Sequence, residues 1–131
     1  MNYRGTIIEE SLENKDVLKD IQIISTKVER VTEKHRTPWL EQWTLLMVEI
    51  PEEKAAEIAE RICRVIDAHH AGSWYVDFKN DVNHFIVFHN KVFRVDRSKR
   101  EQYEEAIKYG ISLGIPDYQL DFAPDIKERR G

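Results

Sequence analysis

Residues 74–96 read WYVDFKNDVNHFIVFHNKVFRVD, and this stretch decides the fold. It holds six of the chain's thirteen aromatic residues, and two turn signals, at 80–83 and 90–91, divide it into three short runs of strand-forming residues. Apolar side chains occur at both odd and even positions, so both faces of the predicted strands are partly apolar. If helices cover one face, the second must meet more chain, a partner subunit or a ligand.

Turn lengths predict which side chains of this stretch share a face of the sheet. With Asn90 and Lys91 as a two-residue loop, His89 lies opposite Val92. One face then carries His84, Ile86, Phe88, Phe93 and Val95. With a four-residue loop at 80–83, the other face carries Trp74, Val76, Phe78, Phe85, Val87, His89, Val92, Arg94 and Asp96. Parity alone leaves open which of the two faces meets the helices.

Strands are also predicted outside this stretch. Alternating apolar residues indicate strands over residues 3–9, 21–32, 43–50 and 118–122. The imperfect alternation at 21–32 suggests a bulge. The run at 43–50 is apolar at both parities, which is typical of a central strand.

Two helices are predicted. The first begins at Pro51, has an apolar stripe at spacings of three and four residues, and closes at 71–73. The second runs from Ser98 to Leu113, where Ser98 and Glu101 form a capping box and Gly114 ends the helix.

From residue 43 onward the predicted order is β, α, β, β with an added hairpin strand, α, β. This is the order of the ferredoxin-like (split βαβ) fold. We therefore expect an α+β domain with a mixed sheet and two helices on one face, plus extra N-terminal strands and one extra hairpin strand. Residues 1–122 would form this single domain, and residues 123–131 a frayed, charged C-terminal tail.

Composition favours a globular protein with a densely charged surface. The chain has 131 residues, of which 41% are hydrophobic and 34% charged, and its formal net charge is −4. No apolar run approaches the ~20 residues needed to span a bilayer, which argues against a membrane protein. The first residues lack the apolar core of a secretory signal and Cys63 is the lone cysteine, so we expect a cytoplasmic protein.

Candidate chemical groups are few. Asp77, His84, His89 and Arg94 could converge as an acid/base site of a small enzyme. The five histidines lack the spacing of a pre-arranged metal site, and no phosphate-binding or nucleophile motif occurs. We therefore expect no metal and no cofactor.

A basic cluster stands at the start of the second predicted helix. Arg97, Lys99 and Arg100 lie where the helix dipole disfavours cations, and a small bound anion would compensate for this. Partial neutralisation by neighbouring acidic residues is the alternative. RNA binding is a further alternative, because the strand order and the aromatic residues of 84–90 suit it, but the acidic net charge argues against nucleic acid.

The segments YRGTIIEESLENKDVLKDIQIISTKVERVTEKHRTPWLEQWTL (3–45) and KYGISLGIPDYQLDF (108–122) resemble a group of small prokaryotic proteins of about this length with no assigned activity. The resemblance implies a self-contained cytoplasmic domain and supplies no catalytic residue or substrate.

These observations do not determine a function. The hypothesis they favour is a noncatalytic domain that forms a homodimer through an open sheet face and that could also bind a small anionic ligand. The residues expected on that face are Trp74, Val76, Phe85, Val87 and His89.

Overall fold

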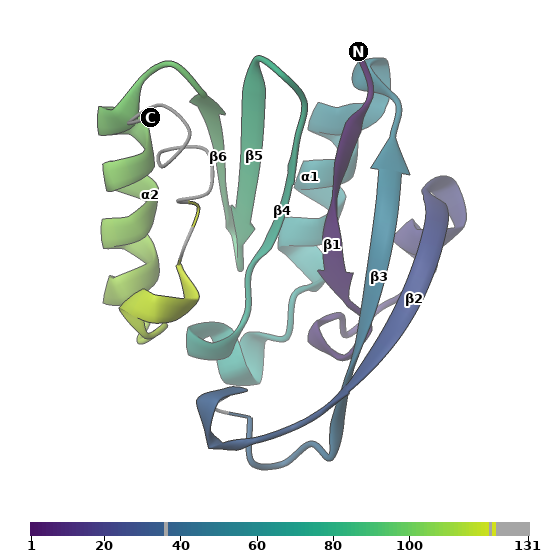
Figure 1. Ribbon diagram of the computed structural model, residues 1–131, viewed down its shortest axis with the longest axis vertical. Coiled ribbons are helices and arrows are strands. Elements are labelled where there is room, and N and C mark those ends of the chain that lie inside the picture. Colours follow the sequence, from purple (N-terminus) through teal and green to yellow (C-terminus); the bar gives the residue numbers. More distant parts are fainter. Residues whose placement is uncertain (36, 121, 123–131) are drawn as a thin grey trace.

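The computed structural model describes residues 1–35, 37–120 and 122. These residues form an α+β structure, in which two α-helices pack on one open, six-stranded antiparallel sheet of order β2-β3-β1-β4-β5-β6 (Figure 1). The strands are β1 (Tyr3–Ile8), β2 (Gln22–Arg30), β3 (Gln42–Ile50), β4 (Val76–Lys79), β5 (Asn83–Phe88) and β6 (Lys91–Asp96). The helices are α1 (Ala55–Val65) and α2 (Arg100–Ser112).

Short 3-10 helices connect these elements. They are η1 (Glu9–Ser11), η2 (Asp16–Asp20), η3 (Glu33–His35), η4 (Glu52–Lys54), η5 (Ala68–Ser73) and η6 (Asp117–Gln119). The predicted strands over 3–9, 21–32 and 43–50 are confirmed. The last of them, expected to be central, lies between β2 and β1, one strand from the edge of the sheet. The bulge expected in the second strand is also present, at the register shift between Ile23 and Ser25.

One face of the sheet packs against α1. The apolar stripe of this helix, Ile58, Ala59 and Ile62, is buried against alternate residues of the strands. The side chains that contribute from the sheet are Val76 and Phe78 of β4, Phe85 and Val87 of β5, and Trp74, which precedes β4. The predicted sharing of a face by these five side chains is therefore confirmed, and it is the α1 face.

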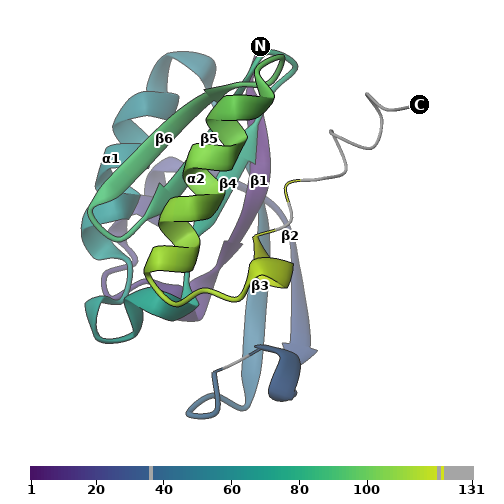
Figure 2. The ribbon, with the colours of Figure 1, turned by 90° about the vertical axis from the view of Figure 1, so that its left-hand side faces the viewer.

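The opposite face packs against α2, so the expectation of two helices on one face is wrong. Ile86 and Phe88 of β5 form a second core with Tyr103 and Ala106 of α2. These β5 residues alternate with those that face α1, and Figure 2 shows the two helices on opposite sides of the sheet. β5, which is apolar at both parities, is thus covered by this chain's own helices on both faces.

The expectation of a mixed sheet is also wrong, because every strand pair is antiparallel. β1 lies between β3 and β4 and pairs with both of them. With β1 on one side of β3 and β2 on the other, β3 has no free edge for a C-terminal strand. The predicted strand over 118–122 is accordingly wrong, and η6 occupies part of this range, with Leu120 and Phe122 buried against α2.

The β5–β6 hairpin differs from the prediction, because its loop lies one residue earlier and its strand register is shifted by two residues. Its loop is His89–Asn90, so Phe88 lies opposite Lys91 and Val87 opposite Val92. Asn90 has a φ of 60°, a conformation that asparagine tolerates better than most residues, and this places it inside the loop. A shift of two residues preserves parity, which is why the predicted faces survive.

The helix ends also differ from prediction. α1 ends at Val65 because Ile66 is extended and forms a β-bridge with Leu12. The predicted capping box is wrong, because α2 begins at Arg100 and its N-cap Lys99 has no side-chain capping hydrogen bond. In the turn before the helix, Asp96 Oδ1 accepts hydrogen bonds from the backbone N–H and hydroxyl of Ser98. The predicted C-terminal stop is confirmed, since Gly114 has a φ of 99°. The tail predicted at 123–131 lies outside the described residues.

Candidate functional site

The residues predicted for an interaction face lie inside the protein. Trp74, Val76, Phe85 and Val87 are each 3% exposed or less, in the core beneath α1. His89 lies near the end of α1, where its Nδ1 is 3.2 Å from the carbonyl oxygen of Ile66. The prediction that these side chains form an open face is wrong, because α1 covers that side of the sheet.

The four side chains predicted for an acid/base site divide between the two faces. Asp77 and His84 meet on the α2 face, where Asp77 Oδ2 lies 2.7 Å from His84 Nε2. Arg94 lies opposite Phe85 in the register and its guanidinium stands 5.5 Å from the centre of that ring, on the α1 face. His89 is also on the α1 side, beside Ile66. The predicted convergence of four groups is therefore wrong, and Asp77 and His84 alone lie together.

The Asp77–His84 pair extends into a chain of three groups. His84 is 1% exposed, and its Nδ1 lies 3.0 Å from the hydroxyl of Tyr103 on α2. Both ring nitrogens of His84 are thus engaged, one by the Tyr103 hydroxyl and the other by Asp77. The carboxylate is one-third exposed, whereas the groups behind it are buried. Asp77 is thus the end of a hydrogen-bonded chain that reaches the surface.

Asp77 opens into a cavity, which we call the Asp77 pocket. Its volume is about 290 Å³. Its described lining residues are Thr6, Ile8, Trp43, Leu45, Ser73, Trp74, Tyr75, Asp77 and Gln119. The floor is the part of the α2 face that belongs to β1, β3 and β4, beyond the residues that pack on α2.

The C-terminal segment borders this pocket and is fixed at two points. The hydroxyl of Tyr75 donates to the carbonyl oxygen of Gln119 at 2.6 Å. The side-chain amide of Gln119 donates to the carbonyl oxygen of Lys34, in η3, at 2.8 Å, and the Tyr118 hydroxyl donates to the same oxygen at 2.9 Å. η6 is therefore linked to β4 and to the β2–β3 connection, two segments far apart in the sequence.

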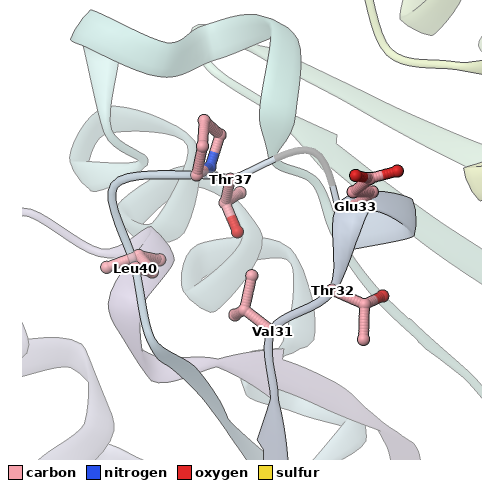
Figure 3. Close-up of a pocket in the computed structure, with 6 residues that line it drawn as sticks. Val31, Thr32, Glu33, Thr37 and Leu40 are labelled. Atoms are coloured by element: carbon pink, nitrogen blue, oxygen red, sulfur yellow. The ribbon is translucent and has the colours of Figure 1, made fainter.

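A second hollow, of about 540 Å³, lies in the connection between β2 and β3 (Figure 3). It is lined by Val31, Thr32, Glu33, Thr37, Pro38 and Leu40. The buried hydroxyl of Thr37 already accepts a hydrogen bond from the indole of Trp43 at 2.9 Å.

Asp67 organises the turn after α1. Burial favours a raised pKa for this carboxyl, but hydrogen bonds from His70, from the backbone N–H of His69 and from the indole of Trp74 outweigh it, and the net pKa is lowered. His70 in turn stacks on Trp39, with ring centroids 3.7 Å apart. These contacts give His70 a structural role in packing the end of the sheet.

The predicted anion site receives no independent support. Arg97 donates from its guanidinium to the carbonyl oxygen of Asn80, while Lys99 and Arg100 are exposed. Asp96 stands beside them, and hydrogen bonds from Ser98 lower the pKa of its carboxyl. Anion binding at this cluster stays a prediction.

Cys63 packs in the core under α1, where its thiol lies 3.1 Å from the carbonyl oxygen of Glu60. Burial raises the pKa of this thiol, with Glu60 adding to the effect. Across 1–35, 37–120 and 122, no group of three or more His, Cys, Asp and Glu side chains is placed to hold a metal ion.

β2 presents an exposed edge. It has one strand neighbour in the described sheet, and eight of its nine residues are exposed. The N–H of Val31 donates to the carbonyl oxygen of Glu41 at 3.0 Å, in the register that pairs Arg30 with Gln42. Because hydrogen-bonded pairs alternate along an antiparallel ladder, the even residues Thr26, Val28 and Arg30 direct their N–H and C=O groups away from β3.

Comparison with known protein families, with curated proteins and with solved structures finds no match. The resemblance to small prokaryotic proteins therefore stays a prediction. In the part of the chain described, no helix is long and apolar enough to cross a membrane.

Proposed function

We propose that the protein is a noncatalytic cytoplasmic domain that forms a homodimer by antiparallel pairing of β2 with β2 of a second copy. The observation that carries the proposal is the β2 edge: nine residues long, exposed, and with outward-directed backbone groups. Such an edge is a template for strand pairing, which proteins that stay monomeric normally block. This interface replaces the sheet face predicted from sequence.

The side chains of β2 favour one register for this pairing. A two-fold axis at Val28 pairs Val28 with itself and sets Thr26 opposite Arg30 through outward backbone groups. It also sets Lys27 opposite Glu29 of the other copy, twice. Axes at Lys27, Glu29 or Arg30 would place like charges directly opposite each other, which is unfavourable. An axis at Thr26 would oppose Glu29 to Ile23.

The apolar side chains at this edge support the same partner. Ile24 and Val28 are 48% and 56% exposed, and Met47 of the adjacent strand is 42% exposed. Lys27 and Glu29 stand 3.6 Å apart on one face of β2 within the same copy. In the dimer they would form a group of four alternating charges on one face of the joined sheet, with the Val28 contact at the axis on the other face.

Charge reversal tests the register. Lys27→Glu replaces two opposite-charge pairs with two Glu–Glu pairs, and we expect dimerisation to weaken about tenfold. Glu29→Lys should have a similar effect, and the double variant Lys27→Glu/Glu29→Lys should restore the dimer. Lys108→Glu, on the exposed side of α2, is the matched control for net charge. Sedimentation equilibrium over a concentration series measures each.

Proline substitution tests the backbone pairing. Val28→Pro removes the N–H that each copy would donate across the axis, yet this N–H does not serve the pairing with β3. We expect a folded monomer, with the fold checked by circular dichroism. A wild-type protein that remains monomeric at every concentration would overturn the proposal, as would a dimer that neither Lys27→Glu nor Val28→Pro weakens.

A further inference from the structure

The Asp77 pocket combines one carboxylate with aromatic and aliphatic walls. Among its described lining residues, Asp77 is the sole aspartate, and no glutamate, histidine, lysine or arginine contributes. Trp43, Trp74 and Tyr75 supply aromatic groups, and Ile8 and Leu45 supply aliphatic ones. A cavity of this composition attracts a cation and repels an anion, because the carboxylate and the aromatic faces both carry negative potential.

The carboxylate is held in a fixed orientation with one oxygen available. Asp77 Oδ2 accepts the hydrogen bond from His84, which is itself held by Tyr103. Within the described residues, Oδ1 of Asp77 has no hydrogen-bond partner. Since the orienting groups are buried, the position of Oδ1 is set before any ligand arrives, and pre-organisation of this kind lowers the free-energy cost of binding.

A hydroxyl-bearing residue lines the pocket on the strand beside Asp77. Thr6 of β1 lies directly opposite Asp77 of β4 in the antiparallel register, and both residues line the pocket. The Thr6 hydroxyl donates to the sulfur of Met47 at 3.1 Å, which leaves its oxygen able to accept. A carboxylate oxygen and a hydroxyl oxygen on paired residues of one pocket suit the several N–H donors of one ammonium group.

We infer that the Asp77 pocket binds a small primary amine with an aromatic or branched aliphatic body. The ammonium group sits between Asp77 Oδ1 and the Thr6 hydroxyl, and the apolar body contacts Trp43, Leu45 and Ile8. A volume of about 290 Å³ admits a compact monoamine rather than a nucleotide or a peptide. The inference does not depend on the homodimer, because the pocket and the β2 edge are formed by different residues.

Binding of a matched ligand series to the wild-type protein is the first test. The probes are phenethylamine, 2-phenylethanol and 3-phenylpropionate, which share a phenyl group and differ in the charge of the head group. We expect saturable shifts of the amides of Thr6, Leu45 and Asp77 in ¹⁵N-HSQC spectra with the amine, and about 10- to 100-fold weaker binding of the alcohol and the acid. Equal affinity for all three, or no saturable shift with the amine, would overturn the inference.

Variants locate the charge that is recognised. Asp77→Asn keeps an oxygen for His84 but removes the charge, so we expect phenethylamine to bind about 10- to 100-fold more weakly. Glu49→Gln is the matched control, because Glu49 lies on the same face of the sheet but outside the pocket, and it should leave binding unchanged. Thr6→Val should weaken amine binding several-fold. Wild-type affinity in Asp77→Asn, or an equal loss in Glu49→Gln, would contradict the assignment.

Discussion

The two halves of the sheet differ in how many of their faces are covered. β5 is buried on both sides, with Phe85 under α1 and Phe88 under α2, and β4 is buried on its α1 side. β1 and β3 are covered by α1 on one side, whereas their other side, around Leu45 and Met47, is only partly buried or exposed. β2 is exposed on both sides. We therefore expect stability to concentrate in the half of the sheet that contains β4 and β5. Binding surfaces should lie on the open half, formed by β1, β2 and β3.

The largest expected effect is a loss of stability, compared between the two halves of the sheet on the α2 face. Phe88→Ala empties a fully buried site between β5 and α2, and we expect the free energy of unfolding to fall by about 3–5 kcal/mol. Met47→Ala, on the same face in the open half, should cost less than about 1 kcal/mol, because Met47 is 42% exposed. Urea denaturation of both variants measures the difference. Similar losses would show that the open half is covered as well.

The second prediction concerns the strand that joins the halves. A Cβ at Gly5 of β1 would stand 2.1 Å from the backbone oxygen of Asp77 in β4, so Gly5→Ala must move two paired strands apart. We expect a loss of about 3 kcal/mol and faster hydrogen exchange of the β1 and β4 amides.

Gly114→Ala is the control for this variant. A Cβ there meets nothing within 4 Å, so its cost of about 1–2 kcal/mol comes from the positive φ alone. It should leave exchange in β1 and β4 unchanged. If Gly5→Ala costs no more than Gly114→Ala, the close approach of β1 and β4 is not what holds the halves together.

The faces of this sheet could be predicted from sequence, whereas its strand order could not. Period-two alternation and short turns fix parity, so Trp74 and Phe85 are assigned to one face and Ile86 and Phe88 to the other, despite a one-residue error in the hairpin loop that shifts the register by two. The place of β1 depends on the fit of Gly5 against β4, a contact between residues more than seventy positions apart. No local pattern encodes it, and the apolar stripe of α2 suits either face.

The candidate site was predictable to a similar extent. Parity places Asp77 and His84 together, and it also separates them from His89 and Arg94, so the predicted four-residue site combined two faces. Nothing in the sequence signals that the hydroxyl of Tyr103 meets His84. The pocket itself requires η6 to contact Tyr75 and Lys34, which follows from tertiary packing alone.

A prediction of intermediate size concerns Asp67, at the end of the sheet. Its lowered pKa in the folded protein means that it stabilises the fold above the unfolded pKa of about 3.9, and that this stabilisation is lost as the pH falls through the folded value. Asp67→Asn should therefore cost about 1–2 kcal/mol at pH 7. The difference from wild type should shrink below about pH 4. Denaturation as a function of pH tests this, and a pH-independent difference would contradict it.

The smallest effect is expected at β2. Val28 is 56% exposed, so Val28→Ala should change the free energy of unfolding of the monomer by less than about 0.5 kcal/mol. Its effect should appear instead in dimerisation, because Val28 lies on the proposed axis. Measuring unfolding below the dimerisation concentration separates the two quantities. A loss above about 1.5 kcal/mol in the monomer would mean that β2 is packed rather than free, and the contrast between the halves would then rest on β1 and β3 alone.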